Sequence, residues 1–187
     1  MDKNAEPTRG SGYIGKVVAA ALVLASLGAV GAAAQAYVEP RIGAVIPASP
    51  QSSSQYTASA SGGLAAGYAP KQKGLGFEAS VDYFFSKAPY IENNNFLIQG
   101  DVTYNLTKGI KILAGPTGLV ESSTINIPPP DNVKNTTTST AVGIQGGIEA
   151  KVFDGFNLRV TDVYMPFSQN VKNLVTATLG YQIPVSK

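Results

Sequence analysis

Apolar and polar side chains alternate along the last two-thirds of the chain. In segment 75–86 the odd positions are apolar and most even positions are polar, and in segment 96–106 the even positions are apolar instead. Side chains of a β-strand point alternately to its two faces, so each segment predicts a strand with one apolar and one polar face. The predicted strands are Val38–Ile46, Gly63–Ala69, Leu75–Ser86, Phe96–Leu106, Ile110–Val120, Thr140–Val152, Phe156–Phe167 and Asn173–Val185.

Two of these segments carry a local irregularity. In the seventh, the apolar positions change from even to odd numbers after Val160, which predicts a bulge near Thr161 and Asp162. In the fifth, Pro116 predicts a bulge or bend, because proline has no N–H to give to a neighbouring strand.

The connections between the predicted strands alternate in length. The longer ones are 47–62, 87–95, 121–139 and, of medium length, 168–172; the shorter ones are 70–74, 107–109 and 153–155. As an alternative for 121–139, strand ends extend into it through Ile125 and Ile127. Strands that run up and down place all the short turns at one end and all the long loops at the other. Amphipathic segments of ~9–12 residues with this loop order are typical of a transmembrane β-barrel with eight antiparallel strands.

Aromatic residues fall near both ends of the predicted strands, mostly on the apolar face. Tyr68, Phe77, Tyr104, Phe156 and Tyr181 lie near the short turns, and Tyr83, Phe85, Phe96 and Phe167 lie near the long loops. Two such groups are expected where a barrel meets the two membrane interfaces.

The first 36 residues resemble a secretory signal peptide in composition. Lys3, Arg9 and Lys16 precede an uncharged segment, 17–34, that is rich in Ala, Val and Leu, and Ala34 and Ala36 form an A-x-A cleavage site. A retained membrane helix is the alternative, although 18 residues is at the short end of the spanning range. We therefore expect a signal peptide over 1–36 and one barrel domain over 37–187.

Charged residues lie on the polar faces of most predicted strands. The candidate site residues are Glu39, Arg41, Glu78, Asp82, Asp101, Lys111, Glu149, Lys151 and Arg159, with Glu121 as a further acid. Since charges belong in neither lipid nor an apolar core, they favour a barrel with its apolar side outward and a paired charge network in its lumen, bridged by Arg41 and Arg159. A gated or ion-conducting lumen is one alternative. An exported soluble barrel, with its apolar face inward around a lipid or small apolar ligand, is the other.

Composition removes several function classes. The chain has no Cys and no His, so thiolate and His metal sites and His-dependent catalysis are excluded, and we expect neither an enzyme nor a cofactor. Without its first 36 residues the chain would keep 11 of its 14 bases and 10 of its 12 acids, with no basic tail, so nucleic acid is not an expected partner.

Over residues 37–187 the pattern of strands and loops resembles the small eight-stranded outer-membrane barrels of the OmpA/OmpX or opacity type. This resemblance implies a bacterial outer-membrane location, the lipid bilayer and the outer-membrane insertion machinery as partners, and a non-enzymatic role. That role is structural or surface-presenting, with weak porin activity as an option and the loops 47–62 and 121–139 as the surface for partners. One departure is the end of the chain, where the family has an aromatic residue and this sequence has Tyr181 as the nearest one.

Overall fold

A computed structural model describes residues 34–48, 58–70, 73–88, 90–127, 133–168 and 171–185, and their regular structure is entirely β. Most of the predicted signal peptide lies outside these residues. The two alanines of its predicted cleavage site are described, and both belong to the first strand. In the described part of the chain, no helix is long and apolar enough to cross a membrane.

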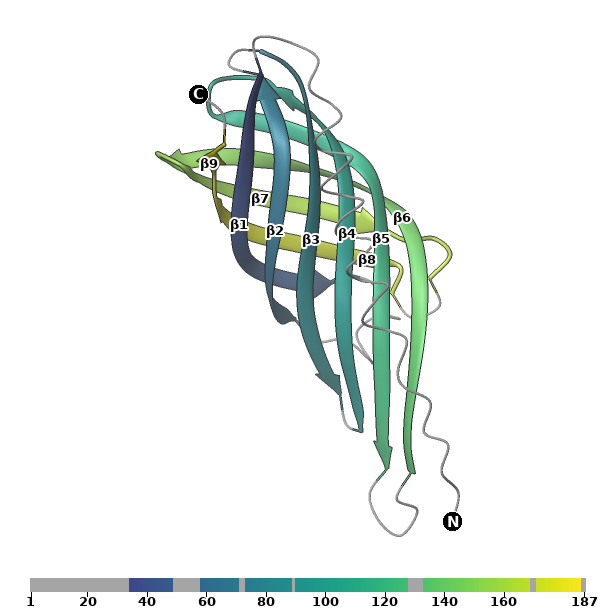
Figure 1. The fold of residues 1–187 in the computed structure, drawn as a ribbon. Coiled ribbons are helices and arrows are strands. Elements are labelled where there is room, and N and C mark those ends of the chain that lie inside the picture. The colour runs from purple at the N-terminus through teal and green to yellow at the C-terminus, as the bar shows by residue number, and fades with distance from the viewer. Residues whose placement is uncertain are drawn as a thin grey trace.

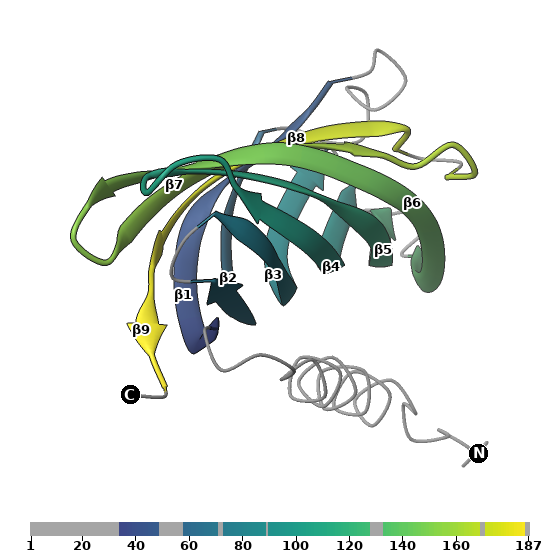
Figure 2. The same cartoon turned by 90° about the horizontal axis from the view of Figure 1, so that it is seen from above.

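The strands form one antiparallel sheet that closes on itself (Figures 1 and 2). They are β1 (Ala34–Pro47), β2 (Ser59–Pro70), β3 (Gly74–Ala88), β4 (Ile91–Asn105), β5 (Ile110–Ile127), β6 (Val133–Phe153), β7 (Phe156–Tyr164), β8 (Asn173–Tyr181) and β9 (Ile183–Pro184). From β1 to β8 each strand pairs with the next in sequence, and β1 also pairs with β8, which closes the ring. The two-residue β9 pairs with β1 in the same register as β8 and so continues that strand. The wall of the barrel therefore consists of eight strands.

The apolar face of the sheet points outward. Ile42 and Val142 are 68% and 65% exposed, whereas Glu78 and Glu149 are 4% and 2% exposed. Aromatic rings gather on the outer face at both ends: the Phe156 and Tyr181 ring centroids are 4.8 Å apart at the short turns, and those of Tyr83 and Phe96 are 5.2 Å apart toward the other end. This arrangement excludes the soluble alternative, because that barrel would hold its apolar side chains inside.

Several strands are longer than the sequence pattern predicts. The predicted loops 87–95 and 121–139 are mostly strand, since β3 and β4 are joined through only 89–90 and β5 and β6 through 128–132. Figure 1 shows β3 to β6 reaching well beyond β1, β2, β7 and β8 at this end. We call this four-stranded projection, formed by the described residues of 85–95 and 121–139, the extension. The alternation of apolar and polar residues is weak in the extension, because both faces of a sheet in water can be polar. The sequence pattern therefore predicts strands there only as an alternative.

The bulge predicted near Thr161 and Asp162 is wrong. Strand β7 keeps a continuous register with both β6 and β8 through these residues, and Val163 points inward with 0% exposure. The apolar positions change phase because the barrel interior itself becomes apolar here, not because the strand slips. The register shift in this hairpin lies instead between Lys151 and Phe153.

Proline and glycine have local effects at two points. Pairing of β5 with β4 stops across Gly115–Pro116 and resumes in the same register, so Pro116 interrupts the ladder without making a bulge. The turn between β6 and β7 has Gly155 at φ 78°, a conformation that glycine adopts at little cost. A Cβ on this glycine would overlap the Tyr181 ring.

Candidate functional site in the barrel interior

The inner face of the barrel carries a buried charge network from six strands. β1 contributes Glu39 and Arg41, β3 contributes Glu78 and Asp82, and β4, β5, β6 and β7 contribute Asp101, Lys111, Glu149 and Arg159. All eight are at most 8% exposed. They occupy the inward positions of their strands, which is why alternation in the sequence placed them on one face.

Arg159 is the centre of this network. Its guanidinium contacts Glu78 at 2.5 and 2.7 Å, and its Nε and Nη2 donate to Glu149 Oε2 at 2.9 and 2.5 Å. Asp101 Oδ2 lies 3.8 Å from Nη1. The planar guanidinium suits this role because its donors lie in a fixed fork that can hold several carboxylates at once.

Arg41 holds a second group of carboxylates. Its Nη2 donates to Glu78 Oε1 at 2.6 Å, and its other nitrogens lie 3.5 Å from Glu39 and 3.9 Å from Asp82. The amide of Asn157 completes the site of Glu39 by donating at 3.0 Å. Glu78 therefore links the two arginines, as predicted for cations that bridge acids across a lumen.

Glycines on neighbouring strands make room for these long side chains. A Cβ on Gly63 would overlap the Asp82 carboxylate, and a Cβ on Gly180 would overlap Glu39. Inward glycines thus allow ionic side chains to lie across a narrow barrel, where eight strands leave space for little else.

Further hydrogen bonds extend the network on both sides. Tyr37 donates its hydroxyl to Glu78 at 2.5 Å, and Lys111 donates to Glu149 at 2.6 Å while its ammonium lies 5.4 Å from the Tyr37 ring centre. Farther along, Gln145 donates to Asp101 at 2.7 Å. A chain of amides and a hydroxyl continues from there: Gln99 hydrogen-bonds Gln145, and Ser80 donates to Gln99 at 2.8 Å.

Lys151 does not belong to the network, which corrects the prediction for this residue. Its side chain is 46% exposed at the short-turn end and donates to Asp154 at 2.9 Å. This hydrogen bond lowers the pKa of the Asp154 carboxyl below its usual value. Glu121 is also separate, since it lies toward the extension and accepts a hydrogen bond from Ser123 at 2.7 Å.

The opposite half of the interior is apolar, which the sequence analysis missed. A cluster of buried side chains fills the barrel toward the extension: Val45, Phe84, Leu97, Leu119, Val163, Met165, Val171 and Leu174. All are at most 2% exposed. Phe84 and Leu97 are the signal that could have revealed it, because both are large apolar residues on the polar face of their strands.

The segment after β7 helps to cover this apolar cluster. The backbone N–H of Met165 donates to the backbone carbonyl of Lys172 at 2.9 Å, and the backbone N–H of Val171 donates to the Ser168 hydroxyl at 3.1 Å. These bonds place Met165 and Val171 inside the barrel mouth with 0% exposure. The interior is thus ionic in one half and densely apolar in the other.

The chemistry of the interior is that of a packed structural core. Among the described residues, no group of three or more His, Cys, Asp or Glu side chains is placed to hold a metal ion. The carboxylates instead contact arginine, lysine and amide groups. Breaking one such buried pair costs roughly 3–5 kcal/mol, because an uncompensated charge remains.

Comparison with solved structures shows which proteins share this fold. The chain is similar to Ail, the attachment invasion locus protein of Yersinia pestis, crystallised with the heparin analogue sucrose octasulfate, at 9% identity, with 80% of this chain and 97% of Ail covered and a TM-score of 0.53. It is also similar to Neisserial surface protein A, at 16% identity with 80% and 97% covered and a TM-score of 0.51.

A third similar structure is the N-terminal β-barrel domain of Pseudomonas aeruginosa OprF. The identity is 14%, the coverage is 80% of this chain and 99% of that domain, and the TM-score is 0.51. No protein-family model and no curated protein sequence matches the chain. The chain thus has the closed eight-stranded, up-and-down fold of the small transmembrane barrels of outer membranes, which confirms the predicted resemblance and fold class.

Proposed function

We propose that this chain is a bacterial outer-membrane protein whose barrel is a non-conducting anchor and whose extension is the functional surface. The observation that carries the proposal is the two-part filling of the lumen, with buried ion pairs in one half and an apolar cluster in the other. A filled barrel serves to hold its projecting strands rigidly, and exposed segments on a rigid scaffold are where binding function concentrates.

The extension has the features of a contact surface. Residues 134–140 of β6 are all exposed, and Thr124 and Thr136 form a hydroxyl pair at 3.1 Å across β5 and β6. The exposed ion pair between Lys87 and Glu92, at 2.8 Å, braces β3 against β4. The predicted loop 47–62 belongs to the same proposal, although 49–57 lie outside the described residues and 59–62 are part of β2. This surface is our candidate for a partner outside the cell, as attachment is for Ail by its name.

Export and insertion belong to the same proposal. The uncharged segment 17–34 supports export through a cleaved signal peptide, and an outer-membrane barrel needs the insertion machinery to close. The charge network supports a non-enzymatic role because every basic member is engaged by carboxylates. Weak porin activity is the competing reading of the same lumen.

The orientation can be tested on whole cells because the chain has no native cysteine. We expect Thr137→Cys, on the extension, to react with a membrane-impermeant maleimide on intact cells. Lys108→Cys, in a short turn, should react only after the outer membrane is permeabilised. The reverse labelling would place the extension in the periplasm and remove the proposed surface role.

Conductance separates the anchor from the porin. The refolded protein in planar bilayers should give no stable current steps, because the apolar cluster leaves no continuous path. Reproducible steps whose size changes with Glu78→Gln would identify a conducting lumen and overturn the non-conducting part of the proposal.

A further inference from the structure

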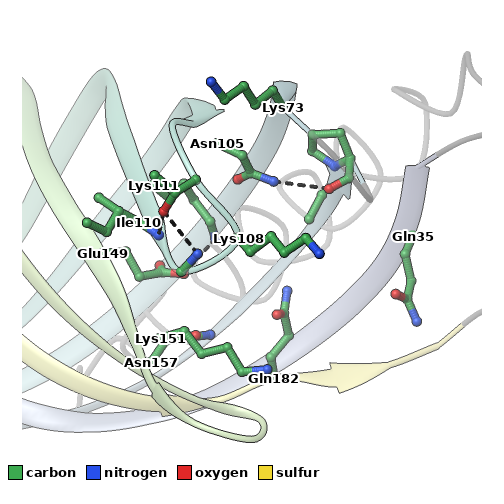
Figure 3. Close-up of a pocket in the computed structure, with 14 residues that line it drawn as sticks. Gln35, Lys73, Asn105, Lys108, Ile110, Lys111, Glu149, Lys151, Asn157 and Gln182 are labelled. Atoms are coloured by element: carbon green, nitrogen blue, oxygen red, sulfur yellow. Dashed lines mark hydrogen bonds and ion pairs between the residues drawn. The ribbon is translucent and has the colours of Figure 1, made fainter.

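A basic vestibule opens at the short-turn end of the barrel (Figure 3). Its volume is about 810 Å³ and it is lined by the turn residues Lys73 and Lys108 and by Lys151 at the end of β6. Its floor is formed by Lys111 and Glu149 of the charge network and by Asn157, which donates a hydrogen bond to Glu39. The vestibule is therefore the unfilled part of the lumen on the short-turn side of the ion pairs.

The charge of this vestibule is strongly one-sided. Four lysines line it against a single carboxylate, that of Glu149, which Lys111 and Arg159 already neutralise. Lys151 has Asp154 as a partner, whereas no hydrogen bond or ion pair from another described residue reaches the side-chain ammonium of Lys73 or Lys108. Lys73 and Lys108, which have no such partner among the described residues, therefore face a concave space whose one carboxylate is already engaged.

The shape of the site suits a ligand with several negative oxygens. In Figure 3 the Lys108 side chain extends from its turn across the opening toward the β1 side, where Gln35 lies. Lining amides supply neutral hydrogen-bonding groups, among them Asn105 and Gln182. Lysine ammonium groups bind phosphate as mobile point charges, without the planar fork that favours carboxylate pairs.

Entry is possible from one side only. The ion pairs form the floor, and beyond them the apolar cluster with Phe84 and Leu97 fills the barrel. A ligand that enters by the short turns must leave by the same way. The vestibule therefore has the geometry of a binding site and not that of a passage.

We propose that this vestibule, the basic cavity around Lys73, Lys108, Lys111 and Lys151, binds a phosphate-bearing anion at the short-turn face of the barrel. Two sources share this chemistry: a free phosphorylated solute, and the phosphate of an anionic lipid headgroup at the rim. In both cases Lys73 and Lys108 supply the attraction, and Lys111 at the floor sets the depth.

The test uses the purified full-length protein with inorganic pyrophosphate as the probe, measured by isothermal titration calorimetry in a zwitterionic detergent. We expect saturable binding that Lys73→Gln combined with Lys108→Gln weakens by about tenfold or more, since two charges are lost. The matched control is Lys134→Gln combined with Lys172→Gln, which removes the same charge at the far end. It should bind pyrophosphate as the unmodified chain does.

Lipid nanodiscs then distinguish the two sources. Pyrophosphate binding that persists in phosphatidylcholine but disappears with phosphatidylglycerol supports the vestibule and identifies lipid phosphate as the occupant. Equal binding in both bilayers supports a soluble anion. Absence of saturable binding in detergent, or an equal loss in the test and control variants, would overturn the proposal, provided the unboiled proteins keep their shifted band on SDS gels.

Discussion

Arg159 on β7 and Glu78 on β3 meet in the middle of the barrel although their strands are diametrically opposite in its wall. Two short contacts of 2.5 and 2.7 Å join them. In a ring of eight strands, β3 and β7 are four positions apart in either direction. This pair therefore ties the two halves of the barrel together through its centre.

Replacing Arg159 should be strongly destabilising. Arg159→Met leaves Glu78 and Glu149 without their main partner, and we expect a loss of roughly 3–5 kcal/mol in the free energy of unfolding. Urea unfolding followed by circular dichroism measures it. Adding Glu78→Gln and Glu149→Gln should recover part of the loss, since no uncompensated carboxylate then remains at this point.

Lys151→Ala is the comparison for this experiment. Lys151 is equally basic and equally part of the polar pattern, but its side chain is exposed. If this variant lost as much stability as Arg159→Met, the charge network would not be the unit that holds the barrel.

A charged side chain placed on the outer face of the barrel should lower the free energy of unfolding if that face contacts lipid. Val160 lies at the centre of β7, points outward and pairs with Ile148 and Ala177. Val160→Arg should cost roughly 2–4 kcal/mol in lipid, and Val185→Arg, beyond the last strand, only about 0–1 kcal/mol. Unfolding in phospholipid vesicles gives both values. Equal small costs would mean that Val160 faces water.

The apolar cluster can be tested with two neighbouring phenylalanines. Phe84 is 1% exposed inside the barrel and Phe85 is 42% exposed on its outer face. Phe84→Ala should cost roughly 3–5 kcal/mol, because it removes buried contacts and leaves a cavity. Phe85→Ala should cost less. The reverse order, measured by urea unfolding, would contradict the interior position of the cluster.

The β6–β7 turn depends on a single glycine. Gly155→Ala combines a positive φ, which costs roughly 1–2 kcal/mol for other residues, with overlap between the new methyl group and Tyr181. We expect slower refolding and a lower urea midpoint. The control is Gly109→Ala in the short turn between β4 and β5, since the nearest atom to its Cβ would be Lys151 Cβ at 3.9 Å.

The sequence was sufficient for the strand number, the topology and the outward direction of the apolar face. It was also sufficient to group the nine proposed site residues on inward positions, although Lys151 lies exposed at the mouth of the barrel, outside the buried network. These results follow from alternation, which acts locally and repeats in every strand.

The features that the sequence analysis missed share one cause. Alternation predicts one polar and one apolar face per strand, whereas the interior is apolar in one half and the extension has few apolar positions. Val163 and Met165 then suggested a bulge, although they line an apolar half of the lumen. In the extension, only Ile125 and Ile127 indicate that strands continue, because strands that leave the membrane need no apolar face. The apolar half of the lumen and the strands of the extension both depend on position along the barrel axis. Periodicity in the sequence gives no information about that position.

Closure of the wall has a consequence for assembly. The network draws on six strands, and Arg41 lies on β1, directly at the seam where it pairs with Gly180 of β8. A sheet that has entered lipid before this seam forms would bring Arg41, Glu78 and Arg159 toward hydrocarbon without their full set of partners. Partially inserted forms are thus penalised by the same charges that secure the finished protein. Insertion and ring closure should therefore occur as one cooperative event, with few long-lived intermediates.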